Sequence, residues 1–251
     1  MLKVVNTARA RYLPGKPIWI TEWGPSYQTS NSPAARINAD HLGAAWSAAF
    51  LSTMLREGID GALFLVTTDH LQPAAGGTME NVWGWPALFV NPETCGGKTY
   101  PKAIFHVLDM VSRLRGNRVV VETPAKSPGV FSCVDPETGT VKMLLWNYDV
   151  LIPEQAPATD RSTAQSIKIR ICGLPKTLAD QPLTIRRWQV SAKEGNAVML
   201  HDQGIKLNAE NTALPLVEEV HLQSRQREVS YPFTMPPSGV SLVEIRAEVQ
   251  R

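Results

Sequence analysis

The sequence predicts an α/β segment followed by an all-β segment, with the change near Gly116 and Asn117. In residues 1–116, short apolar runs typical of buried strands alternate with stretches whose apolar residues recur at helical spacing. In residues 117–251, short runs alternate apolar and polar residues without a long helical period, as in an antiparallel β-sandwich. The chain of 251 residues is long enough for two such domains, which we place at 1–116 and 117–251.

The first segment contains two repeats of strand and helix. Residues 17–21 form a short apolar run suited to a strand that is buried on both faces, and residues 62–66 form a second one. A helix is expected from about residue 38 to residue 57, before Gly58, and another over 104–114, before Gly116. Strand, helix, strand, helix is the order of a parallel α/β architecture.

The second segment contains a series of short strands. The strands are expected over residues 118–122, 129–135, 140–147, 166–172, 183–190, 218–222 and 241–245. Residues 135–139, with Asp, Pro and Gly, form a hairpin-like connection between two of them.

The α/β segment is too short to be a closed barrel. A (β/α)₈ barrel needs about 250 residues by itself, whereas the β-rich part begins after residue 116. Two parallel strands left alone would expose apolar faces and edges. We therefore expect either a fragment, which is the interpretation we favour, or missing elements that come from another chain.

Composition excludes several classes of function. The formal net charge is +2, from 25 basic and 23 acidic residues without a basic run, so neither nucleic acid nor an anionic membrane is an expected partner. There is no stretch of 18 apolar residues and no signal-peptide pattern at Met1, which leaves the compartment open. Cys95, Cys133 and Cys172 have no zinc-site spacing and are expected to be buried or free thiols. No metal or cofactor is expected.

Glu22 is the leading candidate for a catalytic residue. It stands immediately after the first predicted strand, and catalytic side chains of barrel enzymes project from the carboxyl ends of strands. A carboxylate at this place can serve as a nucleophile or as a general acid and base. The neighbouring Trp23 and Tyr27 are suited to stack on a sugar or to lower the local dielectric.

Several stretches of the chain, in order, resemble glycoside hydrolase family 39, which belongs to clan A. Residues 17–24 (Pro-Ile-Trp-Ile-Thr-Glu-Trp-Gly) resemble the seventh barrel strand of the clan, and residues 61–70 resemble the eighth, with Asp69 matching the family Asp. The other similar stretches are the helix at 37–55, the loop at 81–89, the helix start at 98–103 and the closing strand at 235–245. Family 39 includes β-xylosidases and α-L-iduronidases.

The resemblance implies a partial (β/α)₈ barrel, made of its last two βα units, followed by a C-terminal β-sandwich. It implies that Glu22 is the nucleophile of a retaining glycosidase. The acid/base Glu of the clan follows an Asn on the fourth strand, and the dipeptide Asn-Glu does not occur in this sequence. We therefore expect this chain by itself to hydrolyse glycosides negligibly.

The eighth-strand region departs from the family pattern. Leu65 or Val66 occupies the place of a Trp that forms the floor of the sugar site, and His70 begins the stretch that replaces an acidic pair. Asp69 and His70 are candidates for substrate contact, with capping of the strand loop as the other interpretation. Trp83 and Trp85 either supply the stacking surface or pack the loop beneath the barrel.

Two other functions remain open on the sequence. The sandwich aromatics Trp146, Tyr148 and Trp188 are compatible with a carbohydrate-binding module, in which residues 117–251 alone would retain sugar affinity. A degenerate homologue with the fold and without activity is the third interpretation. In each case the partner is a glycoside or an oligosaccharide.

Overall fold

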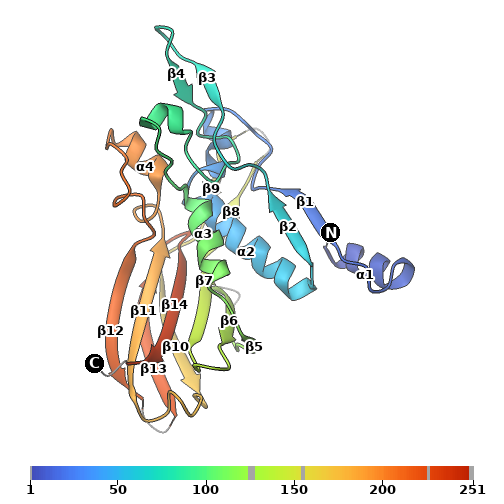
Figure 1. Ribbon diagram of the computed structural model, residues 1–251, viewed down its shortest axis with the longest axis vertical. Coiled ribbons are helices and arrows are strands. Elements are labelled where there is room, and N and C mark those ends of the chain that lie inside the picture. The colour runs from blue at the N-terminus through green and yellow to red at the C-terminus, as the bar shows by residue number, and fades with distance from the viewer. Residues whose placement is uncertain (1, 124–127, 154–155, 225–226, 249–251) are drawn as a thin grey trace.

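The computed structural model describes residues 2–123, 128–153, 156–224 and 227–248. Within them, the first helix α1 spans Leu2–Tyr12 and is followed by the strand β1 at Trp19–Trp23. The helix α2 (His41–Glu57) then leads to β2 (Gly61–Phe64), which pairs with β1 in parallel register. The helix α3 (Ala103–Ser112) follows a long loop. The predicted order of strand, helix, strand and helix is confirmed (Figure 1).

Helix α2 ends where the sequence indicates and begins three residues later. The Asp40 carboxylate caps its start by accepting hydrogen bonds from the backbone N–H groups of Leu42 and Gly43, at 2.9 and 3.3 Å. Gly58 terminates it with a φ of 66°, in the left-handed region that a residue without Cβ adopts most easily.

The connections between the larger elements contain two short hairpins and two 3₁₀ helices. The 3₁₀ helices lie at Pro33–Asn38 and Pro92–Cys95. One hairpin pairs β3 (Leu71–Pro73) with β4 (Met79–Asn81) and projects from the molecule, and the other pairs β8 (Val150–Leu151) with β9 (Thr159–Asp160) (Figure 1).

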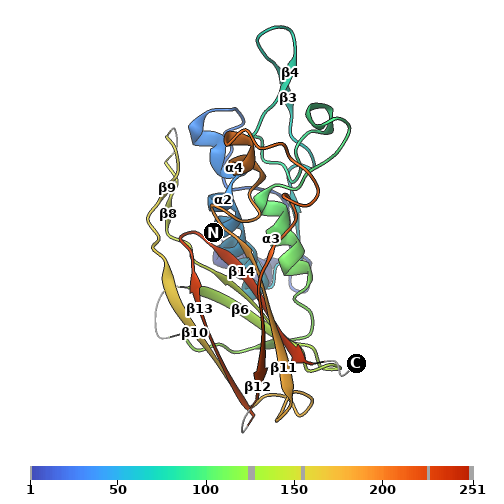
Figure 2. The ribbon, with the colours of Figure 1, turned by 90° about the vertical axis from the view of Figure 1, so that its left-hand side faces the viewer.

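The β-rich segment forms two facing sheets. The larger is a six-stranded antiparallel sheet in the order β12-β11-β14-β7-β6-β5, and the smaller pairs β10 with β13. The strands of the larger sheet span Leu216–Gln223, Pro182–Val190, Val240–Ala247, Val141–Trp146, Gly129–Val134 and Asn117–Val119, in that order. The smaller sheet contains Gln165–Cys172 and Glu228–Met235. One apolar core, with Ile185, Phe233 and Ile245 among its members, lies between the two sheets (Figure 2).

The other face of the six-stranded sheet is covered by α2 and α3. Ala45 and Ala48 of α2 and Val107 of α3 share a core cluster with Leu144 and Trp146 of the sheet. Small alanines on α2 let its backbone come close to the sheet. The two segments that the sequence distinguishes therefore share one continuous hydrophobic core in this structure, and their division at residue 116 stays a prediction.

The strand β1 is not buried on both faces, contrary to the expectation for residues 17–21. Its only strand partner in the described part of the chain is β2, and the side chains of Trp19 and Leu63 are 58% and 52% exposed. The alternative expectation, that two unaccompanied strands would present apolar surface, is confirmed.

Some elements were missed or placed differently. The strand β13 was not predicted. Its Pro232 lacks a backbone donor, and it is tolerated because, among the described residues, β13 pairs with β10 alone. The expected strand at 118–122 is shorter and lies at Asn117–Val119, and the short helix α4 (Ala197–Asp202) was not foreseen. Cys95, Cys133 and Cys172 are free thiols. No helix among the described residues has the length and apolar character needed to cross a bilayer.

Candidate functional site

Glu22 is the penultimate residue of β1, and its side chain is exposed. The strand ends beside the long connection that follows β2 and contains β3 and β4, because a Cβ built on Gly24 would lie 3.6 Å from the Cβ of Pro86. The backbone N–H of Val66, after β2, donates to the carbonyl of the same Pro86. The loops that follow the two strands thus meet at one end of the β1–β2 pair, and Glu22 lies at that end.

Trp23 points away from solvent into an aromatic cluster. Its ring is 6% exposed and lies 4.8 Å from Phe64 of β2, in an edge-on arrangement. Trp46 and Phe50 of α2 complete the cluster, at centroid distances of 6.2 and 5.4 Å from Trp23. In this structure Trp23 anchors the end of β1 to α2 and offers no face to a ligand.

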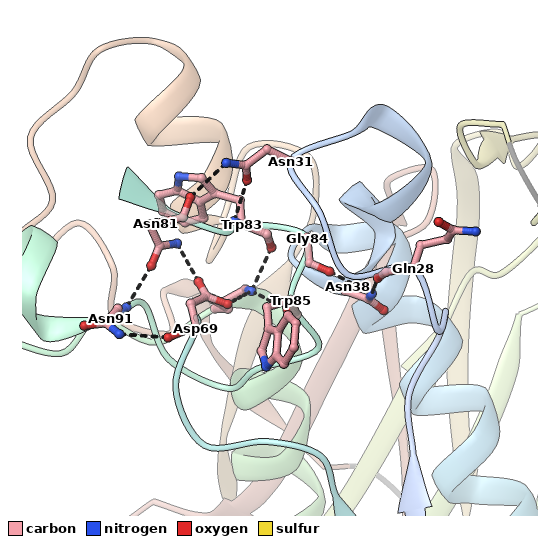
Figure 3. Close-up of polar contacts among 10 residues, drawn as sticks. Gln28, Asn31, Asn38, Asp69, Asn81, Trp83, Gly84, Trp85 and Asn91 are labelled. Carbon is pink, nitrogen blue, oxygen red and sulfur yellow. Dashed lines mark hydrogen bonds and ion pairs between the residues drawn. The ribbon is translucent and has the colours of Figure 1, made fainter. Parts of the chain in front are cut away.

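The loop after β1 carries Tyr27, which is 72% exposed. Buried Asn38 holds this loop in place: its side-chain N–H groups donate to the carbonyls of Gln28 at 2.8 Å and Gly84 at 3.0 Å. Its side-chain oxygen accepts from the backbone N–H of Ser26 at 3.1 Å. One amide therefore ties the loop after β1 to the loop after β2 (Figure 3).

Asp69 is buried rather than presented to solvent. Its side chain is fully inaccessible and forms an ion pair with Lys102, at 2.6 Å between Oδ1 and Nζ. The other carboxylate oxygen accepts from Asn81 Nδ2 at 2.6 Å. Burial raises the pKa of Asp69 to about 6, against the opposing effects of Lys102 and Asn81, and burial lowers the pKa of Lys102. Both oxygens of this carboxylate therefore have partners within the protein.

A ring of asparagines extends the same polar network. Asn81 Oδ1 accepts from the backbone N–H of Asn91 at 3.0 Å, and Asn91 Nδ2 donates to the carbonyl of Asp69 at 2.8 Å. Asn31 accepts from the backbone N–H of Trp83 at 2.8 Å and donates to the carbonyl of Asn81 at 3.1 Å (Figure 3). Asn81 is buried, Asn91 is half-buried and Asn31 is exposed, and their hydrogen bonds join the backbones of these loops.

The two loop tryptophans have different environments. Trp83 is 7% exposed and its ring lies 4.7 Å from that of His201. Trp85 is half-buried, and exposed His70 stacks on it at 5.0 Å with an interplanar angle of 27°. Of the two tryptophans, Trp85 is the one that keeps accessible surface.

Seven residues were predicted to form the site, and the structure divides them by accessibility. Glu22, Tyr27, His70 and Trp85 keep accessible surface, whereas Trp23, Asp69 and Trp83 are buried. The roles themselves stay predictions.

Sequence reasoning did not identify Lys102 or the asparagines. The one signal for Lys102 is a lysine placed directly before an apolar helix, a position more often solvated than buried. His201 was missed because it lies in the β-rich segment, more than 100 positions away from Trp83.

The sandwich aromatics lie in or against the core. Trp146 is 6% exposed and packs beneath α2 and α3, with Tyr148 and Trp188 partly buried against the same cluster. Arg113 covers the ring of Trp188, with Cζ 5.2 Å from its centroid. Among the described residues, no group of three or more His, Cys, Asp or Glu side chains is arranged to hold a metal ion.

The chain matches no known family model and no curated protein. Its fold is nevertheless similar to solved glycosidases. The similarity to the family 39 glycoside hydrolase from Xanthomonas axonopodis pv. citri covers 98% of this chain, with a TM-score of 0.73 and 16% sequence identity. It is also similar to the monomeric β-xylosidase of Caulobacter crescentus, with a TM-score of 0.72, 16% identity and 99% coverage of this chain.

A third similar structure is a bacterial orthologue of human α-L-iduronidase, with a TM-score of 0.68 and 13% identity over the whole of this chain. The chain spans 48%, 49% and 45% of the length of these three proteins, about half. The resemblance to family 39 inferred from the sequence motifs is thereby confirmed at the level of fold.

Proposed function

We propose that the chain is the nucleophile-bearing part of a retaining glycoside hydrolase, and that Glu22 is the nucleophile. One observation carries the proposal. Glu22 is an exposed carboxylate at the end of a parallel strand, where the loops bearing Tyr27, His70 and Trp85 meet. A carboxylate at a strand end is the usual source of catalytic groups in β/α enzymes, and the proteins of similar fold are glycosidases.

The chemistry assigned to Glu22 proceeds in two displacements. Its carboxylate oxygen forms a bond to the anomeric carbon while the bond from that carbon to the leaving oxygen breaks, and a second carboxyl group donates a proton to the leaving oxygen. The second group then takes a proton from water, whose oxygen displaces Glu22 and releases the sugar. In retaining enzymes the two carboxyl groups lie about 5–5.5 Å apart.

The second carboxyl group is expected from elements outside this sequence. The parallel pair β1–β2 exposes Trp19 and Leu63, and the chain spans about half of the similar enzymes. We infer that β1, α2, β2 and α3 form the last two units of a (β/α)₈ barrel, residues 1–116, which six further units complete. Residues 117–251 form the sandwich that supports it.

We assign contact with the substrate to Tyr27, His70 and Trp85, which keep accessible surface. Stacked rings such as His70 on Trp85 provide an apolar face of the kind that packs against a sugar ring. Trp23 and Trp83 act by packing, and Asp69 through its ion pair with Lys102. Sandwich binding through Trp146 or Trp188 is not favoured, because Arg113 and the two helices cover these rings.

The experiment places the chain behind the first six βα units of the Caulobacter β-xylosidase and measures hydrolysis of aryl glycosides. We expect turnover by the fusion, negligible turnover by the 251-residue chain, and loss of activity of 10³-fold or more, about 4 kcal/mol, on Glu22→Gln. Glu80→Gln is the matched control, because Glu80 is an exposed carboxylate on β4, and it should keep activity.

A 2-deoxy-2-fluoro glycoside adds a direct test, because it forms a slowly hydrolysed ester with the nucleophile. Mass spectrometry should find the label on the peptide containing Glu22. An active fusion that is unaffected by Glu22→Gln, or labelled elsewhere, would refute the assignment. A folded fusion without turnover would favour the degenerate homologue. Clear turnover by the isolated chain, abolished by Glu22→Gln, would contradict the need for further units.

A further inference from the structure

Lys102 is a buried cation whose three N–H groups all have partners. It occupies the N-cap position of α3 with its side chain fully inaccessible, and its Nζ lies 2.6 Å from Asp69 Oδ1. The same nitrogen donates to the carbonyl of Trp83 at 2.9 Å and to the carbonyl of Trp85 at 3.0 Å. A lysine ammonium has three donors and no acceptor, so this environment satisfies it completely.

The two carbonyls belong to the segment after β4 that carries Trp85, the half-buried ring on which exposed His70 stacks. Their residues flank Gly84, at which a Cβ would come within 2.0 Å of the carbonyl oxygen of Ser30. The backbone N–H of Lys102 also donates to the carbonyl of Leu88 at 2.8 Å, farther along the same loop. Lys102 therefore sets the direction of the Trp83–Gly84 and Trp85–Pro86 peptide groups, and with them the side from which the Trp85 ring emerges.

A buried ion pair is an expensive way to fill space. Desolvation of the two charges opposes their burial, and well-packed apolar residues often serve stability equally well. An apolar side chain in place of Lys102 would leave the buried carbonyl of Trp83 without its side-chain donor. It would leave the carbonyl of Trp85 with the backbone N–H of Ala87, at 2.8 Å, as its donor. What the ammonium supplies beyond packing is the fixed orientation of these two peptide groups.

We propose that Lys102 is the positioning residue for the sugar-binding wall formed by Trp85 and His70. Lys102 touches no substrate. It acts by holding the carbonyls of Trp83 and Trp85, while Asp69 balances its charge and Asn81 orients Asp69. That the wall binds a sugar rests on the proposed function. That Lys102 positions the wall rests on the polar network alone.

The test uses the 251-residue chain and proton NMR of the ring of His70, whose signals are shifted by the stacked ring of Trp85. Trp85→Phe identifies these shifts. Two variants remove the cation: Lys102→Met, and Lys102→Met combined with Asp69→Leu, which leaves no unpaired buried charge and keeps the test available if the single variant fails to fold. Arg187→Met is the matched control, because it removes an ion pair, with Glu218 at 3.0 Å, within the β-sheets.

We expect both Lys102 variants to abolish the ring-current shift of His70 and the control to preserve it. Titration with methyl β-D-xyloside should show at least about tenfold weaker binding in the Lys102 variants, the size of one good contact. An unchanged His70 shift in the folded double variant would overturn the positioning role. A lost shift with unchanged affinity would overturn the role of the wall in sugar binding.

The two proposals fail in different ways. If the folded fusion neither binds nor hydrolyses glycosides while the Lys102 variants still lose the His70 shift, the proposed function is refuted and the positioning of Trp85 stands.

Discussion

Lowering the pH from 7 to 5 should remove stability through His106, a buried neutral imidazole on α3. The side chain is 2% exposed, and its Nε2 is buried with no hydrogen-bond partner among the described residues. Burial lowers its pKa from 6.5 to about 4, against a backbone hydrogen bond with Thr212 and the charge of Asp109 that favour protonation, while Arg113 opposes protonation.

The direction and the size of the change in folding stability follow from the pKa of His106 in the unfolded chain, 6.5, and in the folded protein, about 4. Below pH 6.5 the unfolded chain binds a proton at His106, whereas the folded protein does not until about pH 4, so stability falls as the pH decreases between these values. Between pH 7 and pH 5 the differential protonation amounts to about 2 kcal/mol, which corresponds to about 4–8 °C in Tm for a chain of this size.

The assay is urea unfolding at pH 7 and pH 5, for the wild type and for His106→Gln. Asp40 and Asp69 act in the opposite direction, because burial raises both pKa values from 3.8 to about 6, and their contribution to stability is lost as the pH rises through that window. The quantity to compare is therefore the difference between wild type and variant. His106→Gln should remove about 2 kcal/mol of the pH dependence, and His221→Gln, at a side chain 56% exposed, serves as the control. An identical pH dependence in wild type and His106→Gln would refute the reasoning.

Substitutions at four positions test the packing and the polar network around the site by chemical unfolding at pH 7. Lys102→Met should cost about 3–5 kcal/mol because it leaves the buried Asp69 charge unpaired, and a loss below about 1 kcal/mol would show that the pair is not sequestered. Trp23→Ala should cost about 3–5 kcal/mol by emptying the aromatic cluster, and a near-neutral result would contradict its burial. Asp40→Ala should cost about 1 kcal/mol because α2 loses its N-cap. Asp40→Asn should keep most of the wild-type stability, because asparagine also accepts hydrogen bonds at an N-cap. Gly84→Ala should cost about 1–3 kcal/mol or more, because its Cβ would overlap backbone, and wild-type stability would mean that the loop yields.

Local patterns were sufficient for the elements with a clear period. The helix ending before Gly58 and the strand with alternating isoleucines at Ile167, Ile169 and Ile171 both appear as expected, because the period of the apolar residues is itself the record of which face is buried. The strand at Glu228–Met235 has the same alternation, yet Pro232 within it obscures the pattern. Only the tertiary arrangement, in which β13 is paired on one side, shows why this proline is harmless.

The sequence by itself indicated which residues of the chain belong to the candidate site. The tertiary structure decided which of their side chains point inward and which are accessible. A carboxylate directly after an apolar strand placed Glu22 at a strand end without further information. Trp23 faces α2 because of Trp46 and Phe50, which are 23 and 27 positions away, and Asp69 is buried because of Lys102, 33 positions away. A loop has no period to reveal which side chains face inward. Its orientation is decided by long-range contacts that satisfy buried polar groups, and these exist only once the chain has folded.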